Sequence, residues 1–268
     1  WTTNLNIAFN RNEITKMGTN NTPKGGYSNQ EDFNRLAVGE PIGIFMGYVF
    51  DGVYMTEEEF NSQPKHASSE IGTVRMKDVS GPNGVPDGII DNNDRVKIGD
   101  PNPDFIGGFT NTFRYKAFDL SLFFQFSYGN EVFNANRVLF ENGRTVLSST
   151  NQFASLANRW SKDNPTSNIP VINGIGGNFY SSRTVEDGSY LRFKTASLGY
   201  NFDKRLLKKI GVQSTRLYVA GQNLCTWTKY SGLNPDVSVR SSSALTPAFD
   251  LSPYPTCWNV TFGVEITF

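Results

Sequence analysis

The chain has 268 residues, and its 25 Lys and Arg balance 25 Asp and Glu, so no basic excess exists to neutralise a nucleic-acid backbone. A single histidine and two cysteines without CxxC spacing exclude a histidine-rich metal cluster and a zinc knuckle. No apolar run is long enough for a membrane helix, whereas aromatic residues make up 13% of the chain and favour strands. The composition therefore indicates a β protein.

Strand patterns begin at the first residues. Leu5, Ile7 and Phe9 alternate with polar or small residues, which is the period of a strand. Because Trp1 is neither a start methionine nor part of a signal peptide, we expect the chain to be a fragment that lacks an upstream strand partner. A second strand is predicted over Ile42–Tyr54, although it contains glycines, which are unusual in strand interiors.

Four strands are predicted in the middle of the chain. A hairpin joins Phe109–Tyr115 to Leu120–Tyr128 through a tight bend, and Tyr190–Phe202 and Ser214–Thr228 form the next pair. The basic segment Asp203–Val212 between that pair predicts one helical turn closed by a glycine.

The clearest alternation is in the last eleven residues, which form the seventh predicted strand. The odd-numbered positions are polar or glycine, and we predict that the even-numbered, apolar ones face lipid: Trp258, Val260, Phe262, Val264, Ile266 and Phe268. The chain stops on an aromatic residue with no polar tail, and we expect Phe268 to act in barrel assembly.

The connections between the predicted strands are alternately long and short. This places long loops at one end of the sheet and short turns at the other, as in bacterial membrane barrels. Only Glu13–Pro41, on the short side, breaks the rule. Within the second long loop, Phe153, Leu156, Ala157 and Trp160 have helical spacing and predict a helix that fixes its own loop.

No segment carries a catalytic signature. The nucleotide-binding and nucleophile-elbow motifs are absent from the sequence. The acidic pairs Glu57 with Glu59 and Glu186 with Asp187 lie in polar segments without a sign of burial, so we interpret them as solvated. We therefore predict no catalytic residue and no enzyme activity.

The segment Asp78–Asp94 is dense in side-chain oxygens around a glycine turn and resembles a calcium-binding loop. Its departures are an insertion over Pro82–Pro86, a serine at the third position and an aspartate at the last. The alternative is an acidic loop satisfied by its own backbone amides. The candidate calcium ligands are Asp78, Ser80, Asp87, Ile89 through its carbonyl, Asp91 and Asp94.

The two cysteines flank the same long loop on neighbouring predicted strands. A disulfide between Cys225 and Cys257 is one reading, but strand parity places them on opposite faces of the sheet. Two free thiols is the interpretation that the parity favours.

Short motifs follow one another in a specific order along the chain. They are Gly39–Gly43, Gly47–Tyr48, Asp51–Gly52, Lys77–Val79, Ile98–Pro103, Glu186–Arg192, Leu198–Tyr200, Arg216–Tyr218, Gly221–Leu224 and Gly232–Asp236. Together they resemble the C-terminal part of the SusC/RagA family of TonB-dependent outer-membrane transporters of Bacteroidetes, over the whole chain.

This resemblance implies an outer-membrane barrel of about 22 strands with a plugged lumen, of which this chain would be the C-terminal portion. The plug and the segment that contacts the TonB complex would lie upstream, outside the chain. It also implies a SusD-like lipoprotein partner and import of oligosaccharides or peptides. The expected fold is thus all-β, about seven antiparallel transmembrane strands with long extracellular loops. The alternative is a secreted β-sandwich that binds glycans, in which the aromatic rows would form a buried core.

Overall fold

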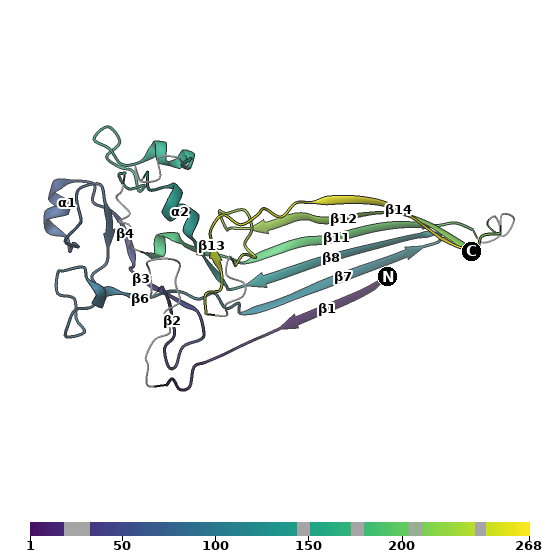
Figure 1. Ribbon diagram of the computed structural model, residues 1–268, viewed down its shortest axis with the longest axis horizontal. Coiled ribbons are helices and arrows are strands. Elements are labelled where there is room, and N and C mark those ends of the chain that lie inside the picture. Colours follow the sequence, from purple (N-terminus) through teal and green to yellow (C-terminus); the bar gives the residue numbers. More distant parts are fainter. Residues whose placement is uncertain (19–32, 144–150, 173–179, 204–206, 208–210, 239–244) are drawn as a thin grey trace.

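The computed structural model describes residues 1–18, 33–143, 151–172, 180–203, 207, 211–238 and 245–268. Its main feature is one antiparallel sheet that extends away from a layer of loops (Figure 1). The strands follow in the order β1 (Thr2–Ala8), β7 (Phe105–Tyr115), β8 (Phe118–Tyr128), β11 (Tyr190–Asn201), β12 (Ser214–Thr228) and β14 (Asn259–Thr267). Neighbours in this sheet are neighbours in the order of the chain, as in an up-and-down barrel wall.

The main sheet has six strands, and the prediction that Ile42–Tyr54 forms one more strand of it is wrong. That segment divides into β3 (Ile44–Gly47) and β4 (Phe50–Val53), which belong to two separate small sheets in the loop layer. Gly43, with φ of 85°, directly precedes β3, and Gly52, with φ of 114°, lies within β4 where the pairing with β5 shifts its register, so neither position has the backbone of a regular extended strand.

Because Ile42–Tyr54 is not a strand of the main sheet, Glu13–Pro41 belongs to a long connection and no longer breaks the rule of long loops opposite short turns. Residues 9–104 form one long connection from β1 to β7, and residues 129–189 and 229–258 form the other two, all at the same end of the sheet (Figure 1). The bend at residues 116–117 lies at the opposite end, where β11 also ends and β12 begins. The predicted arrangement of long loops opposite short turns is therefore confirmed.

Among the described residues, the loop layer contains three small sheets and two short α-helices. The sheets are β2 (Asn34–Arg35) with β3 and β6 (Val96–Gly99); β4 with β5 (Val74–Met76); and β10 (Val185–Asp187) with β9 (Glu131–Asn134) and β13 (Phe249–Asp250). The helices are α1 (Glu57–Ser62) and α2 (Ala135–Phe140). Aromatic residues from all three long connections pack into one core, formed chiefly by Phe33, Phe45, Phe133, Tyr180 and Phe249.

Two predicted helical segments differ in outcome. Around Phe153–Trp160 the structure has only a 3-10 turn over Ala154–Asn158, because the Trp160 amide bonds instead to the Ile169 carbonyl. Much of the predicted turn between β11 and β12 lies outside the described residues. Its closure by Gly211, which has φ of 76°, agrees with the prediction.

A bulge divides β11 into two halves. Phe193 pairs with Phe124 of β8, whereas Thr195 pairs with Phe123, so Lys194 is an extra residue. The pairing between β11 and β12 shifts at the same level, where Asn223 of β12 has φ of 51°. The apolar face consequently carries odd-numbered residues of β11 before the bulge and even-numbered ones after it.

Candidate functional site

One face of the main sheet carries apolar side chains on every strand. Cross-strand partners share a face, so the register joins Leu5, Phe109 and Phe124 into a row that continues to Phe193. The rings of Phe109 and Phe124 stack at 4.7 Å, and those of Phe124 and Phe193 at 4.6 Å. Cross-strand partners on β11, β12 and β14 form further rows of apolar side chains on the same face.

This apolar face is open to solvent rather than packed against a second layer. Its exposed members include Leu5, Phe113, Leu198, Leu217, Phe262 and Val264. A large contiguous apolar surface of this kind marks a membrane or protein interface. The sandwich alternative is therefore wrong, because a sandwich would bury these aromatic rows under a second sheet.

The apolar face has the height of a bilayer and aromatic residues at both ends. Strands β7 and β8 have 11 residues each, which at about 3.3 Å per residue and a tilt near 45° spans roughly 25 Å. Phe105 stacks on Tyr128 at the loop end, and Trp1 stacks on Phe113 at the turn end. Such girdles are typical of transmembrane barrels.

The opposite face of the sheet is polar. Asp119 of β8 binds Arg216 of β12 at 2.7 Å and Asn201 of β11 at 2.8 Å, so one carboxylate joins three strands. The Arg216 side chain fills the space beside Gly199, and the Tyr218 ring covers Gly263 of β14. The small residues thus make room for long polar side chains on the polar face of the sheet.

A cleft of about 830 Å³ lies where this polar face meets the loop layer. The apolar side chains of Ile106 and Phe123 contribute to it although their strand parity places them on the polar face. Pro235 and Pro247 of the β12–β14 connection also line it. The otherwise polar face of the sheet is therefore locally apolar just below the loops.

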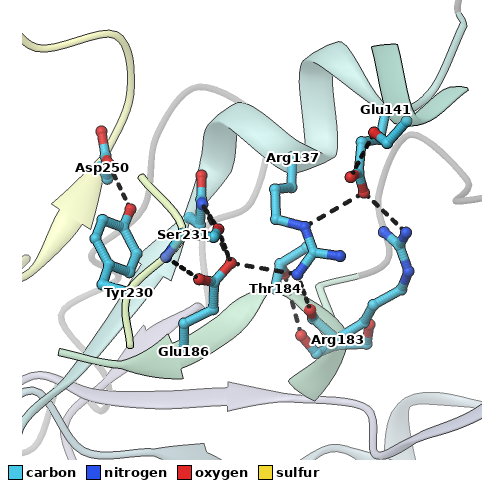
Figure 2. Close-up of polar contacts among 11 residues, drawn as sticks. Arg137, Glu141, Arg183, Thr184, Glu186, Tyr230, Ser231 and Asp250 are labelled. Atoms are coloured by element: carbon cyan, nitrogen blue, oxygen red, sulfur yellow. Dashed lines mark hydrogen bonds and ion pairs between the residues drawn. The ribbon is translucent and has the colours of Figure 1, made fainter. Parts of the chain in front are cut away.

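Segments from two long connections meet in a polar network in the loop layer (Figure 2). Glu186 accepts hydrogen bonds from the Ser231 amide at 2.8 Å and hydroxyl at 2.9 Å, and pairs with Arg137 at 3.2 Å. Arg137 also binds Glu141 at 3.3 Å, and Glu141 binds Arg183 at 2.8 Å. The network therefore ties α2, β10 and the segment after β12 together.

Burial and charge together set the ionisation of this network. Burial alone would raise the pKa of Glu141, but the guanidinium groups of Arg137 and Arg183 bring that pKa below its ordinary value. At the other side of the network, Tyr230 donates to Asp250, and burial together with this bond raises the pKa of Tyr230. Both groups keep their usual ionisation states near neutral pH.

The interpretation of the acidic pairs as solvated is wrong for Glu186, whose side chain is only 13% exposed. Asp187, its neighbour, is exposed as expected, because alternate residues of β10 point to opposite sides. Glu57 is exposed on α1, whereas Glu59 pairs with Arg75. A strand of three residues is too short for alternation of polar and apolar residues in the sequence to show that Glu186 is buried.

Several motif residues that carry the resemblance anchor loops to the sheet. Arg192, which is 4% exposed, binds Asn234 at 2.6 Å and Asp236 at 3.3 Å. Asn102 donates to the Ile42 carbonyl at 2.9 Å and to Asp100 at 2.8 Å. Sequence reasoning identified these motifs but not their positioning role, since Asn234, Asp236 and Ile42 lie far along the chain from the residues that they bind.

In the acidic loop, the carboxylates bind backbone amides. Asp94 is fully buried and accepts from the amides of Val79 at 2.8 Å and Asp91 at 2.8 Å. Asp78 Oδ2 accepts from the Gly88 amide at 2.6 Å, while its Oδ1 is buried with no hydrogen-bond partner in the structure. Within the described ranges, no three His, Cys, Asp or Glu side chains are grouped as metal ligands.

The remaining predicted residues have these positions. The apolar side of β14 carries Val260, Phe262, Val264 and Ile266, which pair with β12 residues of the same face. Trp258 and Phe268 adjoin the ends of the strand, and all six residues are exposed. Their contact with lipid, and a role of Phe268 in assembly, stay predictions. Cys225 and Cys257 are free thiols, as the parity argument predicted. No helix among the described residues is both long and apolar enough to traverse a bilayer.

Comparison with known proteins gives consistent relatives by sequence and by fold. The chain is 36% identical over its whole length to TonB-dependent receptor P3 of Formosa agariphila, and 26% identical to TonB-dependent receptor SusC of Bacteroides thetaiotaomicron. It matches the solved RagAB peptide transporter with a TM-score of 0.75 and 23% identity over 99% of the chain. No protein-family model matches it. The chain covers 27%, 24% and 26% of these three proteins.

Proposed function

Since the chain belongs to the SusC/RagA type of TonB-dependent transporters, we propose that it is the C-terminal portion of an outer-membrane β-barrel that imports nutrients. The observation that carries this proposal is the six-stranded sheet with one exposed apolar face of bilayer height and one polar face. Both edge strands, β1 and β14, have one unpaired side, which must bind further strands inside a lipid phase.

The proposed transport path runs along the polar face, with the loop layer at its extracellular mouth. The cleft between that face and the loops supports this, because it offers polar and apolar groups to a solute before the lumen. The rest of the barrel, a plug and the segment that contacts the TonB complex would come from the remainder of the protein. Relatives of the same type are receptors and transporters, which supports a non-enzymatic role.

We further propose a SusD-like lipoprotein as the partner at the extracellular mouth and an oligosaccharide or a peptide as the cargo. The peptide is favoured by one structural neighbour, which is named a peptide transporter. The oligosaccharide rests on the family resemblance. The loop layer supports a docking role because its core and polar network hold all three long connections in one unit.

Deletion of the gene, followed by growth on defined nutrients, tests this function. We expect growth to fail on one class of oligosaccharide or peptide and to return with the full-length gene. The same uptake should stop when the TonB complex is inactivated, and a surface lipoprotein should copurify with the tagged transporter. Recovery of the wild-type protein in the soluble fraction would contradict the membrane assignment.

Calcium at the acidic loop is a second, separate proposal. The buried Asp78 Oδ1 without a partner supports it, because an anionic oxygen out of water favours a cation. Binding requires the loop to rearrange, since Asp94 already accepts from backbone amides. Terbium luminescence on the purified transporter should saturate and be displaced by calcium, and Asp78→Asn should remove the signal. Equal signals from wild type and variant would contradict the site.

A further inference from the structure

A pocket of about 390 Å³ lies in the loop layer, between the connection at residues 129–189 and the connection at residues 229–258. The first connection contributes Phe140 of α2 and Phe153 to its lining, and the second contributes Leu233 and Pro253. The volume falls in the range of about 300 to 1,000 Å³ that is typical of small-ligand pockets.

The apolar side chains of the pocket are available to a ligand. Phe140 and Phe153 pack edge to face at 5.6 Å, and the Phe153 amide donates to the Phe140 carbonyl at 2.8 Å, which fixes the two rings relative to each other. Phe153 is 42% exposed and Leu233 is 73% exposed. The pocket therefore offers an apolar surface that the loop layer does not cover.

On the side of β13, the polar side chains of the pocket bind one another. Asn136 donates to Asp250 at 2.9 Å and accepts from the Ser252 amide at 2.7 Å and the Ser252 hydroxyl at 3.3 Å. Asp250 is the one charged residue among the described residues that line the pocket, and it is 1% exposed and also accepts from Tyr230. A ligand in the pocket therefore meets no exposed charge, which favours a neutral group.

The polar side chains on the side of Ser231 are occupied in the same way. The Ser231 hydroxyl donates to Glu186 at 2.9 Å and accepts from Asn134 at 3.2 Å. Asn134 Oδ1 has no hydrogen-bond partner in the structure, but it is buried and closed to a ligand in the pocket. A sugar ring would lose hydrogen bonds to water without replacing them with bonds to these side chains, whereas an apolar side chain has none to lose.

The pocket adjoins the cleft that lies on the proposed transport path. Two segments border both spaces, because residues 231–233 line the pocket and residues 235–237 line the cleft, while Asp250 and Ser252 line the pocket and residues 247–248 line the cleft. A ligand held in the pocket would therefore lie beside the entrance to the polar face of the sheet.

We propose that this pocket binds an apolar side chain, such as leucine or phenylalanine, of a peptide that the transporter imports. The side chain would lie against Phe153 and Leu233, and the rest of the peptide would extend toward the cleft. The inference rests on the proposed function and selects the peptide from the two classes of cargo named there.

Calorimetric titration of the full-length transporter in lipid nanodiscs tests the pocket. The probes are two glycine pentapeptides that carry either phenylalanine or serine at the central position, and maltopentaose is the oligosaccharide probe. We expect the phenylalanine peptide to bind about tenfold or more tightly than the serine peptide, because an aromatic side chain is buried. Leu233→Ser and Phe153→Ser should each remove most of this preference. The matched control is Val38→Ser, which changes an exposed apolar residue outside the pocket and should leave the preference intact.

Equal binding of the two peptides by the wild-type protein would overturn the proposal, and so would a preference that survives both pocket substitutions. Binding of maltopentaose that Leu233→Ser weakens would make the pocket a sugar site instead. Loss of the copurifying lipoprotein from the Leu233→Ser variant, with unchanged peptide binding, would make it a docking surface for that partner.

Fractionation and growth separate this failure from failure of the proposed function. A transporter that reaches the outer membrane and supports TonB-dependent growth, but binds both peptides equally, refutes only the pocket. Absence of the wild-type protein from the outer membrane refutes the proposed function as well.

Discussion

Replacing Glu186 with alanine tests whether the polar network holds the segment after β12 in place. The change removes two hydrogen bonds to Ser231 and one to Asn134, and leaves the Ser231 amide without its acceptor. Because the Glu186 side chain is only 13% exposed, solvent cannot compensate fully. Loss of charged hydrogen bonds of this kind costs about 2 to 4 kcal/mol of local stability.

Amide hydrogen exchange of the full-length transporter measures the effect. That loss corresponds to exchange roughly 30- to 700-fold faster in residues 230–237, with little change in β8. The control is Glu58→Ala, which removes an exposed carboxylate of α1 and should change neither segment. Unchanged exchange in residues 230–237, or an equal increase in β8, would refute the idea that Glu186 fixes this segment.

Three further predictions follow from the same structure. Val264→Arg should lower outer-membrane yield by placing a charge in lipid, at about 2 to 4 kcal/mol near the midplane, whereas Thr261→Arg on the polar face should not. Gly263→Val should lower the heat stability of the folded barrel on gels, because its side chain would meet the Tyr218 ring; an unchanged transition would contradict this packing. Glu141, whose folded pKa is depressed, contributes stability above its ordinary pKa of 4.5 that is lost as pH falls through the lower folded value. Proteolysis of the loop layer should therefore rise below about pH 4.5, and Glu141→Gln should remove that step.

The sequence predicts the strands of the main sheet well because their period of two is a local signal. Asn259–Thr267 alternates without interruption and Phe118–Tyr128 alternates except at Phe123, and the structure places both in the main sheet. The pattern fails at Ile42–Tyr54, where Gly43 and Gly52 have positive φ values and the segment forms two short strands in place of one long strand. Apolar content alone cannot tell a strand in lipid from a strand in the loop core.

The polar anchors could not be predicted, because their partners are distant in sequence. Glu186 meets Ser231, and Arg192 meets Asn234, across connections whose paths the sequence does not specify. Phe123 and Ile106 also depart from the expected polarity, since they are apolar residues on the polar face that line the cleft below the loops. Such residues are recognised only when the register of the sheet is known.

The bulge at Lys194 has a consequence for the tolerance of this protein to insertions and deletions. Lys194 is the one residue that β11 has in excess over β8, so its removal alone would leave Phe193 and Thr195 paired with Phe124 and Phe123 and both halves of β11 on their present faces. Removing a further residue from β11 would slip one half by one position and turn Arg192 to the apolar face of the sheet. The guanidinium would also leave Asn234 and Asp236. We therefore expect evolution to conserve the lengths of the strands. The connections at residues 9–104, 129–189 and 229–258 can vary in length and supply new specificities while the sheet stays the same.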